Sequence, residues 1–150
     1  MVREAILAVC PSADSALVSL CPRCGSADHG PLRAVSAPVV VSVSYSGPHV
    51  AVAVAPSASV TALGIDIERG DPFEVLHDLA PLFSPADPPT RRGWTAIEAA
   101  VKADGRGLNV SPERVHVVSG RATVPGNATS FEIRELEAPY GVTATLAFAP

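Results

Sequence analysis

Residues 39–46 read VVVSVSYS, residues 49–55 read HVAVAVA and residues 60–68 read VTALGIDIE. In these segments the residue type alternates with a period of two, which is typical of β-strands that bury one face. Gly47 and Pro48 form a turn signal between the first two segments, which predicts a hairpin. The third segment predicts another strand, with Leu63, Ile65 and Ile67 facing the core.

Two helical patterns follow these strands. Residues 72–83 carry apolar side chains at helical spacing, and Asp71 before Pro72 suits a helix start. A second helix is predicted from Gly93 or Thr95 to Asp104, where glycines stop it. Further strands are predicted at residues 114–118, 122–124, 131–137 and 142–148. This order predicts an α+β fold, in which an antiparallel sheet packs on two helices.

The length of 150 residues fits a single domain, residues 1–150. Residues 2–9 suggest a short strand, and residues 10–37 a loop-rich N-terminal segment. Hydrophobic residues make up 47% of the chain and charged residues 17%, which argues against disorder. The net charge of −4 argues against a nucleic-acid partner.

No apolar run approaches the ~20 residues of a membrane helix, so no membrane partner is expected. The acidic Glu4 and the short apolar run after it do not resemble a secretory signal, which favours a cytoplasmic location. Three cysteines cannot all pair, so in that compartment they are expected to be thiols or metal ligands.

Four charged side chains could carry chemistry. Asp66 and Glu68 share one strand face, with Cα atoms about 7 Å apart. Gly64 beside them is expected to leave backbone room for a ligand. Glu98 and Lys102 share a helix face. These residues are either ordinary surface charges and an ion pair, or a carboxylate site for Mg²⁺ with a phosphate-binding lysine.

The sequence resembles the 4′-phosphopantetheinyl transferases of the Sfp type. Residues 64–68 match the family pattern G-[IV]-D-[IV]-E, and residues 94–108 resemble W-x-x-K-E-A-x-x-K-x-x-G-x-G-L. Residues 82–87 resemble F-S-x-x-E, and residues 42–46 resemble the strand that carries S-H-S. Residues 21–31 resemble the C-x-x-C-G…H-G-[KR]-P stretch of actinobacterial members. The resemblance covers about residues 21–148, and the order of five motifs makes it specific.

The family transfers the phosphopantetheine arm of coenzyme A to a serine of an acyl or peptidyl carrier protein. By this resemblance, Asp66, Glu68 and Glu98 would hold Mg²⁺, which neutralises charge on the pyrophosphate. Glu98 and Lys102 would be catalytic, and Lys102 would bind phosphate or help to deprotonate the serine. Trp94 would pack the helix against the sheet.

The same resemblance implies that Ser44, Tyr45, His49 and Lys102 line the coenzyme A site. Tyr45 stands where the family has the histidine of S-H-S, and Ile97 stands where it has a lysine. Tyr45 is either a core aromatic or a catalytic hydrogen-bond donor in a changed pocket. His49 would replace the lost histidine or simply begin a strand.

A third departure is the missing basic residue between Gly30 and Pro31. Each charge-assisted phosphate contact contributes roughly 1.5–3 kcal/mol, so the three departures predict weakened coenzyme A binding. Sfp-type enzymes contain two similar halves with the active site between them, and this chain resembles the later half. The resemblance therefore implies one such half that pairs with a second copy as a homodimer.

Other residues leave alternatives open. Cys21, Cys24, His29 and Cys10 could form a zinc site, or the cysteines could be free thiols in a loop. Three functions remain possible: a divergent transferase, the same fold used as a cyclase or dehydratase on a polyketide or peptide product, and a non-catalytic module that binds carrier proteins.

Overall fold

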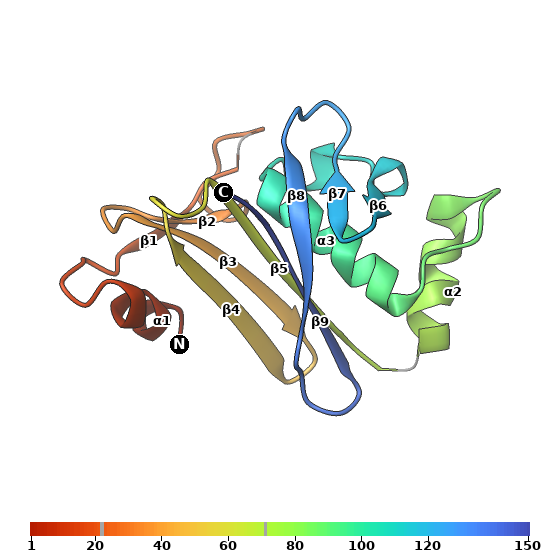
Figure 1. Cartoon of the computed structure of the whole chain (residues 1–150), viewed down its shortest axis with the longest axis horizontal. Helices are drawn as coiled ribbons and strands as arrows, with labels where there is room; N and C mark the ends of the chain where they lie inside the picture. The colour runs from red at the N-terminus through yellow and green to blue at the C-terminus, as the bar shows by residue number, and fades with distance from the viewer. Residues whose placement is uncertain (22, 71) are drawn as a thin grey trace.

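The computed structural model describes residues 1–21, 23–70 and 72–150, with side chains except at residues 72–76 and 108. The chain has the predicted α+β architecture with antiparallel sheets (Figure 1). Its helices are α1 (Val2–Val9), α2 (Pro72–Phe83) and α3 (Arg91–Asp104), with short 3₁₀ turns η1 (Gly107–Asn109) and η2 (Pro112–Arg114). Its strands are β1 (Leu17–Ser19), β2 (Leu32–Ala34), β3 (Val39–Ser46), β4 (His49–Pro56), β5 (Ala62–Arg69), β6 (His116–Val118), β7 (Arg121–Thr123), β8 (Ser130–Leu136) and β9 (Val142–Ala149).

Strands β3 and β4 form the predicted hairpin, paired in register from Val39 opposite Pro56 to Ser46 opposite His49. Gly47 at the turn has φ +57°, a conformation that glycine adopts without strain. The valine face of the hairpin packs toward α1, where Val41 joins a core cluster with the fully buried Ile6. The other face of β3 carries serines, and it is directed at β5.

Serine side chains join this hairpin to the main sheet. The hydroxyls of Ser42, Ser44 and Ser46 accept hydrogen bonds from the backbone N–H groups of residues 65, 67 and 69 at 3.0, 3.2 and 2.9 Å. The backbone of β5 pairs with β9 on its other edge. Three serine hydroxyls therefore take the place of backbone carbonyls on the free edge of β5.

The main sheet has five antiparallel strands in the order β5-β9-β8-β7-β6, and α3 packs against it. Their shared core consists mainly of small aliphatic side chains, with Phe131 as the largest buried one. Leu63, Ile65 and Ile67 are all buried, as predicted. Helix α2 lies beside α3 rather than on the sheet (Figure 1), and Phe83 meets Trp94 edge-to-face with ring centroids 6.3 Å apart.

Gly64 is the point where α3 comes closest to β5. A Cβ built at this position would lie 2.0 Å from the carbonyl oxygen of Ala99 and 2.5 Å from the amide nitrogen of Ala103. The prediction that Gly64 leaves room for a ligand is therefore wrong, because the backbone of α3 fills that space. This contact also brings the helix residues Glu98 and Lys102 to the strand that carries Asp66.

The N-terminal segment differs from the prediction. Residues 2–9 form α1 and not a strand, because Val2 and Ile6 at i,i+4 spacing bury the same face of a helix. Within residues 10–37, predicted as loop, the short strands β1 and β2 pair as a hairpin. Both departures lie where the tertiary core, and not local propensity, decides the conformation.

The predicted bounds of the second helix are nearly correct. Helix α3 begins at Arg91, earlier than predicted, because the Thr90 hydroxyl caps it by accepting from the backbone N–H of Gly93 at 3.1 Å. It ends at Gly105 in the left-handed conformation, as predicted. The predicted helix start at Asp71 lies outside the described residues.

Candidate functional site

The residues Ser44, Asp66 and Lys102 meet where β3, β5 and α3 adjoin. The Lys102 ammonium donates to Asp66 Oδ1 at 2.6 Å and to the Ser44 hydroxyl at 2.9 Å. The Ser44 hydroxyl in turn donates to Asp66 Oδ1 at 2.8 Å. Lys102 is the only lysine of the chain, so this site contains the chain's one ammonium side chain.

Ser44 uses its whole hydrogen-bonding capacity inside the protein. Its hydroxyl donates to Asp66 and accepts from Lys102 and from the backbone N–H of Ile67. A hydroxyl offers one donor and two acceptor positions. In this arrangement Ser44 orients Asp66 and Lys102 and has no hydrogen-bonding position left over. That Ser44 lines a coenzyme A site stays a prediction.

Asp66 is a buried acid with one satisfied oxygen. The residue is 4% exposed, and its Oδ2 atom has no hydrogen-bond partner among the described residues. Burial raises the pKa of Asp66, and the charge of Lys102 opposes part of this rise. An unpartnered buried acceptor costs about 1–3 kcal/mol, which is typical of a site that a ligand completes.

Glu68 and Glu98 lie close enough to Asp66 for its charge to act on both. Burial raises the pKa of both carboxyl groups, and the negative charge of Asp66 raises each further. The Ser46 hydroxyl donates to Glu68 Oε2 at 3.3 Å. Glu68 also raises the pKa of Glu98, so the three acids act on one another electrostatically.

The three carboxylates are suitable ligands for a hard divalent cation, but their oxygens are not close enough together to hold one in the present rotamers. Three carboxylates offer only oxygen ligands, and Asp66 Oδ2 stays free because Lys102 engages Oδ1. However, the oxygens of Asp66, Glu68 and Glu98 do not all lie within 4.8 Å of one another. Cation binding would therefore require the partly exposed glutamates to change rotamer, while buried Asp66 stays in place.

Two other predicted site residues lie differently. Tyr45 alternates with Ser44 along β3, so it lies on the opposite face from Asp66, and it is 70% exposed. Of the two alternatives for Tyr45, the core aromatic is wrong, because the core cluster around Ile6 includes Val43 on β3 but not Tyr45. His49 pairs with Ser46 across the hairpin, which puts it half-buried on the serine face. Trp94 packs on Phe83 and the core, and its indole opposes part of the rise in the pKa of Glu68.

Sequence reasoning missed the supporting role of Ser42 and Ser46. The signal was present, since three serines occupy alternate positions of an otherwise valine-rich strand. What they bind could not be read from that pattern, because their partners lie 23 residues further along the chain.

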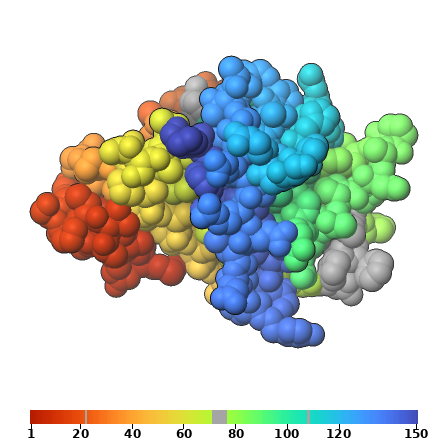
Figure 2. All heavy atoms as spheres, in the orientation of Figure 1, coloured from red at the N-terminus to blue at the C-terminus, as the bar shows by residue number. Residues whose placement is uncertain are grey.

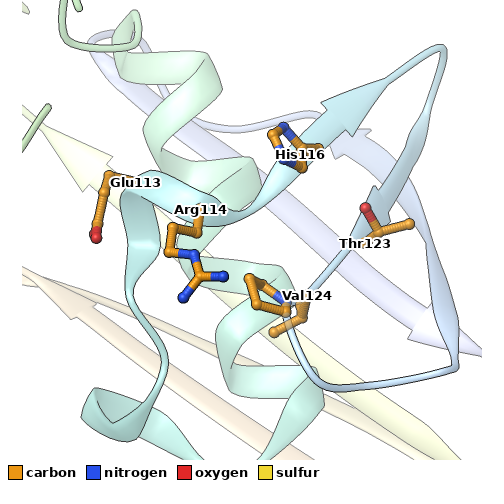
Figure 3. A pocket seen from close by; sticks show the side chains of 6 residues that line it. Glu113, Arg114, His116, Thr123 and Val124 are labelled. Atoms are coloured by element: carbon orange, nitrogen blue, oxygen red, sulfur yellow. The ribbon is translucent and has the colours of Figure 1, made fainter.

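A pocket of about 360 Å³ lies away from these acids, between η2 and strands β6 and β7 (Figure 3). It is lined by Glu113, Arg114, His116, Thr123, Val124 and Pro125. None of the predicted site residues belongs to this pocket, and its exposed His116 has no ion-pair partner among the described residues.

A second cluster forms in the connection between β1 and β2. Donor atoms of Cys21, Cys24 and His29 all lie within 4.8 Å of one another. Backbone N–H groups of Cys24 and Arg23 lower the pKa of the Cys21 thiol to about 7. Cys10, the fourth ligand considered, is not part of this group.

No protein-family model matches the chain, and no curated protein matches its sequence. Among the described residues, no helix combines the length and the apolar character that crossing a bilayer requires.

Proposed function

We propose that this chain is a divergent phosphopantetheinyl transferase-like protein, which moves the phosphopantetheine arm of coenzyme A to a serine of an acyl or peptidyl carrier protein. The observation that carries the proposal is the unpartnered Oδ2 of buried Asp66, with Glu68 and Glu98 close enough for the charge of Asp66 to raise their pKa. The order of motifs around these residues supports the same assignment.

Asp66, Glu68 and Glu98 would hold Mg²⁺, which when bound supplies charge neutralisation for a pyrophosphate. Three ionised carboxylates and one ammonium carry a net charge of about −2, which one divalent cation balances. Lys102 and Ser44 both engage Oδ1 of Asp66, which leaves Oδ2 without a partner. Its side chain is 29% exposed, so it can also meet a phosphate from solvent.

Weak coenzyme A binding is part of this proposal. Ile97, at the family's lysine position, is 6% exposed and belongs to the core. Tyr45, at the histidine position, lies on the wrong face of β3 to reach Asp66. Phosphate contacts then depend on Lys102 and His49, so we expect a high KM for coenzyme A and not the loss of turnover.

A second candidate is acid–base chemistry on a carrier-bound product, as in a cyclase or dehydratase. It is favoured by the short ion pair between Lys102 and Asp66, which already neutralises part of the site without a cation. Burial and the charge of Asp66 raise the pKa of Glu98, which favours a role as a general acid. This chemistry would proceed in the presence of a chelator, whereas the transferase reaction would not.

The test is transfer to apo carrier proteins, measured as the mass gained from coenzyme A with Mg²⁺. Glu68→Gln and Glu98→Gln should each lower the rate by at least about 100-fold, since they remove metal ligands. Glu137→Gln is the matched control, because Glu137 is exposed and lies outside the site. No mass gain with several carrier proteins would contradict the transferase, and tolerance of Glu68→Gln would contradict a metal enzyme.

We also propose that two copies pair as a homodimer in the cytoplasm, where the three free cysteines stay reduced. Exposed apolar side chains gather in the N-terminal segment, where Leu20 is 47% and Val35 63% exposed. Figure 2 shows the first residues of the chain, in red, at one end of the molecule, where a second copy could approach. Sedimentation equilibrium should find a dimer that Leu20→Glu with Val35→Glu makes monomeric; a monomeric unmodified protein would contradict this.

A further inference from the structure

The connection between β1 and β2 holds three metal-binding side chains in one place. Cys24 Sγ lies 3.4 Å from His29 Nε2, and the Cys21 thiol completes a group whose donor atoms all lie within 4.8 Å. Cys24 and His29 are exposed, so an ion can reach them from solvent. The group lies outside the carboxylate site, and the proposed transferase chemistry makes no use of it.

The backbone forms this arrangement without help from a metal. Gly25 has φ +70° and donates its N–H to the Cys21 carbonyl at 2.9 Å, which closes a turn around the two cysteines. The Cys21 N–H donates to the Ser26 carbonyl, also at 2.9 Å.

Gly30 fixes the third side chain of the group. It has φ +108°, and a Cβ there would lie 2.6 Å from backbone atoms of both Leu20 and Cys21. Only glycine fits such a contact, and it presses the segment after His29 directly against the backbone of Cys21. Two independent backbone features therefore bring the imidazole and the thiols together.

We infer that Cys21, Cys24 and His29 bind one Zn²⁺ ion, with a water molecule in the fourth position. Two thiolates and an imidazole are the soft and borderline ligands that zinc prefers, in the C-x₂-C spacing of zinc sites. Among the described His, Cys, Asp and Glu residues, no fourth side chain joins the group. Cys10 stays outside it, so the site has three protein ligands and one open position.

The position of the site indicates what the ion does for the protein. It closes the connection between β1 and β2, two strands of three residues each that, within the described part of the chain, pair only with one another. Such a short hairpin is marginal in water. A metal link between its ends would stabilise it, and with it the exposed apolar segment assigned to the dimer contact.

The test uses the full chain, kept reduced with a phosphine, stripped by a chelator and titrated with ZnCl₂ alone. We expect one equivalent of Zn²⁺ per chain. Cys24→Ser and His29→Ala should each weaken binding by at least about 100-fold, because removal of outer-shell partners already costs 10–100-fold. Cys10→Ser is the matched control and should bind like the unmodified protein.

A second measurement does not depend on any variant. Alkylation of the unmodified chain, followed by peptide mass spectrometry, should show Cys21 and Cys24 protected by Zn²⁺ and Cys10 labelled equally with and without it. Failure of Zn²⁺ to protect these two thiols would overturn the inference. So would stoichiometric binding that survives Cys24→Ser and His29→Ala, or that disappears in Cys10→Ser with the fold retained by circular dichroism.

Discussion

The two carboxylate oxygens of Asp66 differ in their hydrogen bonding. Its Oδ1 takes hydrogen bonds from Ser44 and Lys102, while its Oδ2 is buried without a partner among the described residues. In an ion pair that serves stability alone, both carboxylate oxygens would have hydrogen-bond partners. The combination therefore distinguishes a candidate binding site from a salt bridge that serves stability alone.

The pKa shifts of these acids predict how stability depends on pH. The pKa of Glu98 is raised in the folded protein above its ordinary value of 4.5, chiefly by burial and then by Asp66. Between these two pKa values the folded state binds more protons than the unfolded state, so stability falls as pH rises above about 4.5. Glu98→Gln should make this fall shallower.

Urea denaturation without added metal, at a series of pH values from 4.5 upward, measures this pH dependence of stability. Glu137→Gln should keep the slope of the unmodified protein, since Glu137 is exposed and outside the site. An equally steep fall in Glu98→Gln would show that this carboxyl is not the group whose proton is held in the folded state.

Helix α3 and strand β5 position the site through backbone contact. The absence of a side chain at Gly64 lets the helix approach until its Ala99 carbonyl and Ala103 amide nitrogen adjoin the strand. At this distance the Lys102 ammonium reaches Asp66 at 2.6 Å. The serine hydroxyls of β3 then hold the other edge of β5.

Gly64→Ala should be strongly destabilising. Its methyl group would lie 2.0 Å from the Ala99 carbonyl oxygen, so α3 must move away from β5. We expect a loss of about 3 kcal/mol in the free energy of unfolding, together with loss of the proposed transferase activity. Gly93→Ala is the control in the same helix, where the nearest atom to an added Cβ is Pro89 Cβ at 3.1 Å, which can yield.

Chemical denaturation measures both variants. Gly93→Ala should change stability little or raise it by up to about 1 kcal/mol, because alanine favours a helix. If Gly64→Ala were as stable as the unmodified protein, the close approach of α3 could not be what brings Lys102 to Asp66.

The whole molecule brings the carboxylate site together from three separate elements. Ser44, Asp66 and Lys102 belong to β3, β5 and α3, and the pairs that meet are 22, 36 and 58 residues apart. A cation bound there connects β5 with α3, so its binding should stabilise the entire fold. Free Mg²⁺ at about 100 times its Kd should contribute about 2.7 kcal/mol.

In thermal unfolding at neutral pH, this corresponds to a rise in Tm of about 5–10 °C for a chain of this size. Asp66→Asn should abolish the rise, while Cys24→Ser should keep it, because the zinc cluster is a separate site. Sodium chloride at equal ionic strength is the control for screening. An equal rise in Asp66→Asn would contradict magnesium binding at the carboxylates.

Local pattern by itself determined the α+β class, the long hairpin, both helix regions that follow it and the strands after them. It did so because alternation and helical spacing record which face of an element is buried. The same spacing already placed Asp66 with Glu68 and Glu98 with Lys102 on common faces, which is why the acids could be named in advance.

Only the tertiary structure decided what fills the space beside those faces. Gly64 admits a helix and not a ligand, Ser44 is saturated by internal partners, and residues 2–9 become a helix over Ile6. Each outcome depends on a partner distant in sequence, and a local pattern carries no record of that partner's position. The burial of Asp66 Oδ2 without a partner also depends on the tertiary structure, because it results only when three elements distant in sequence pack together.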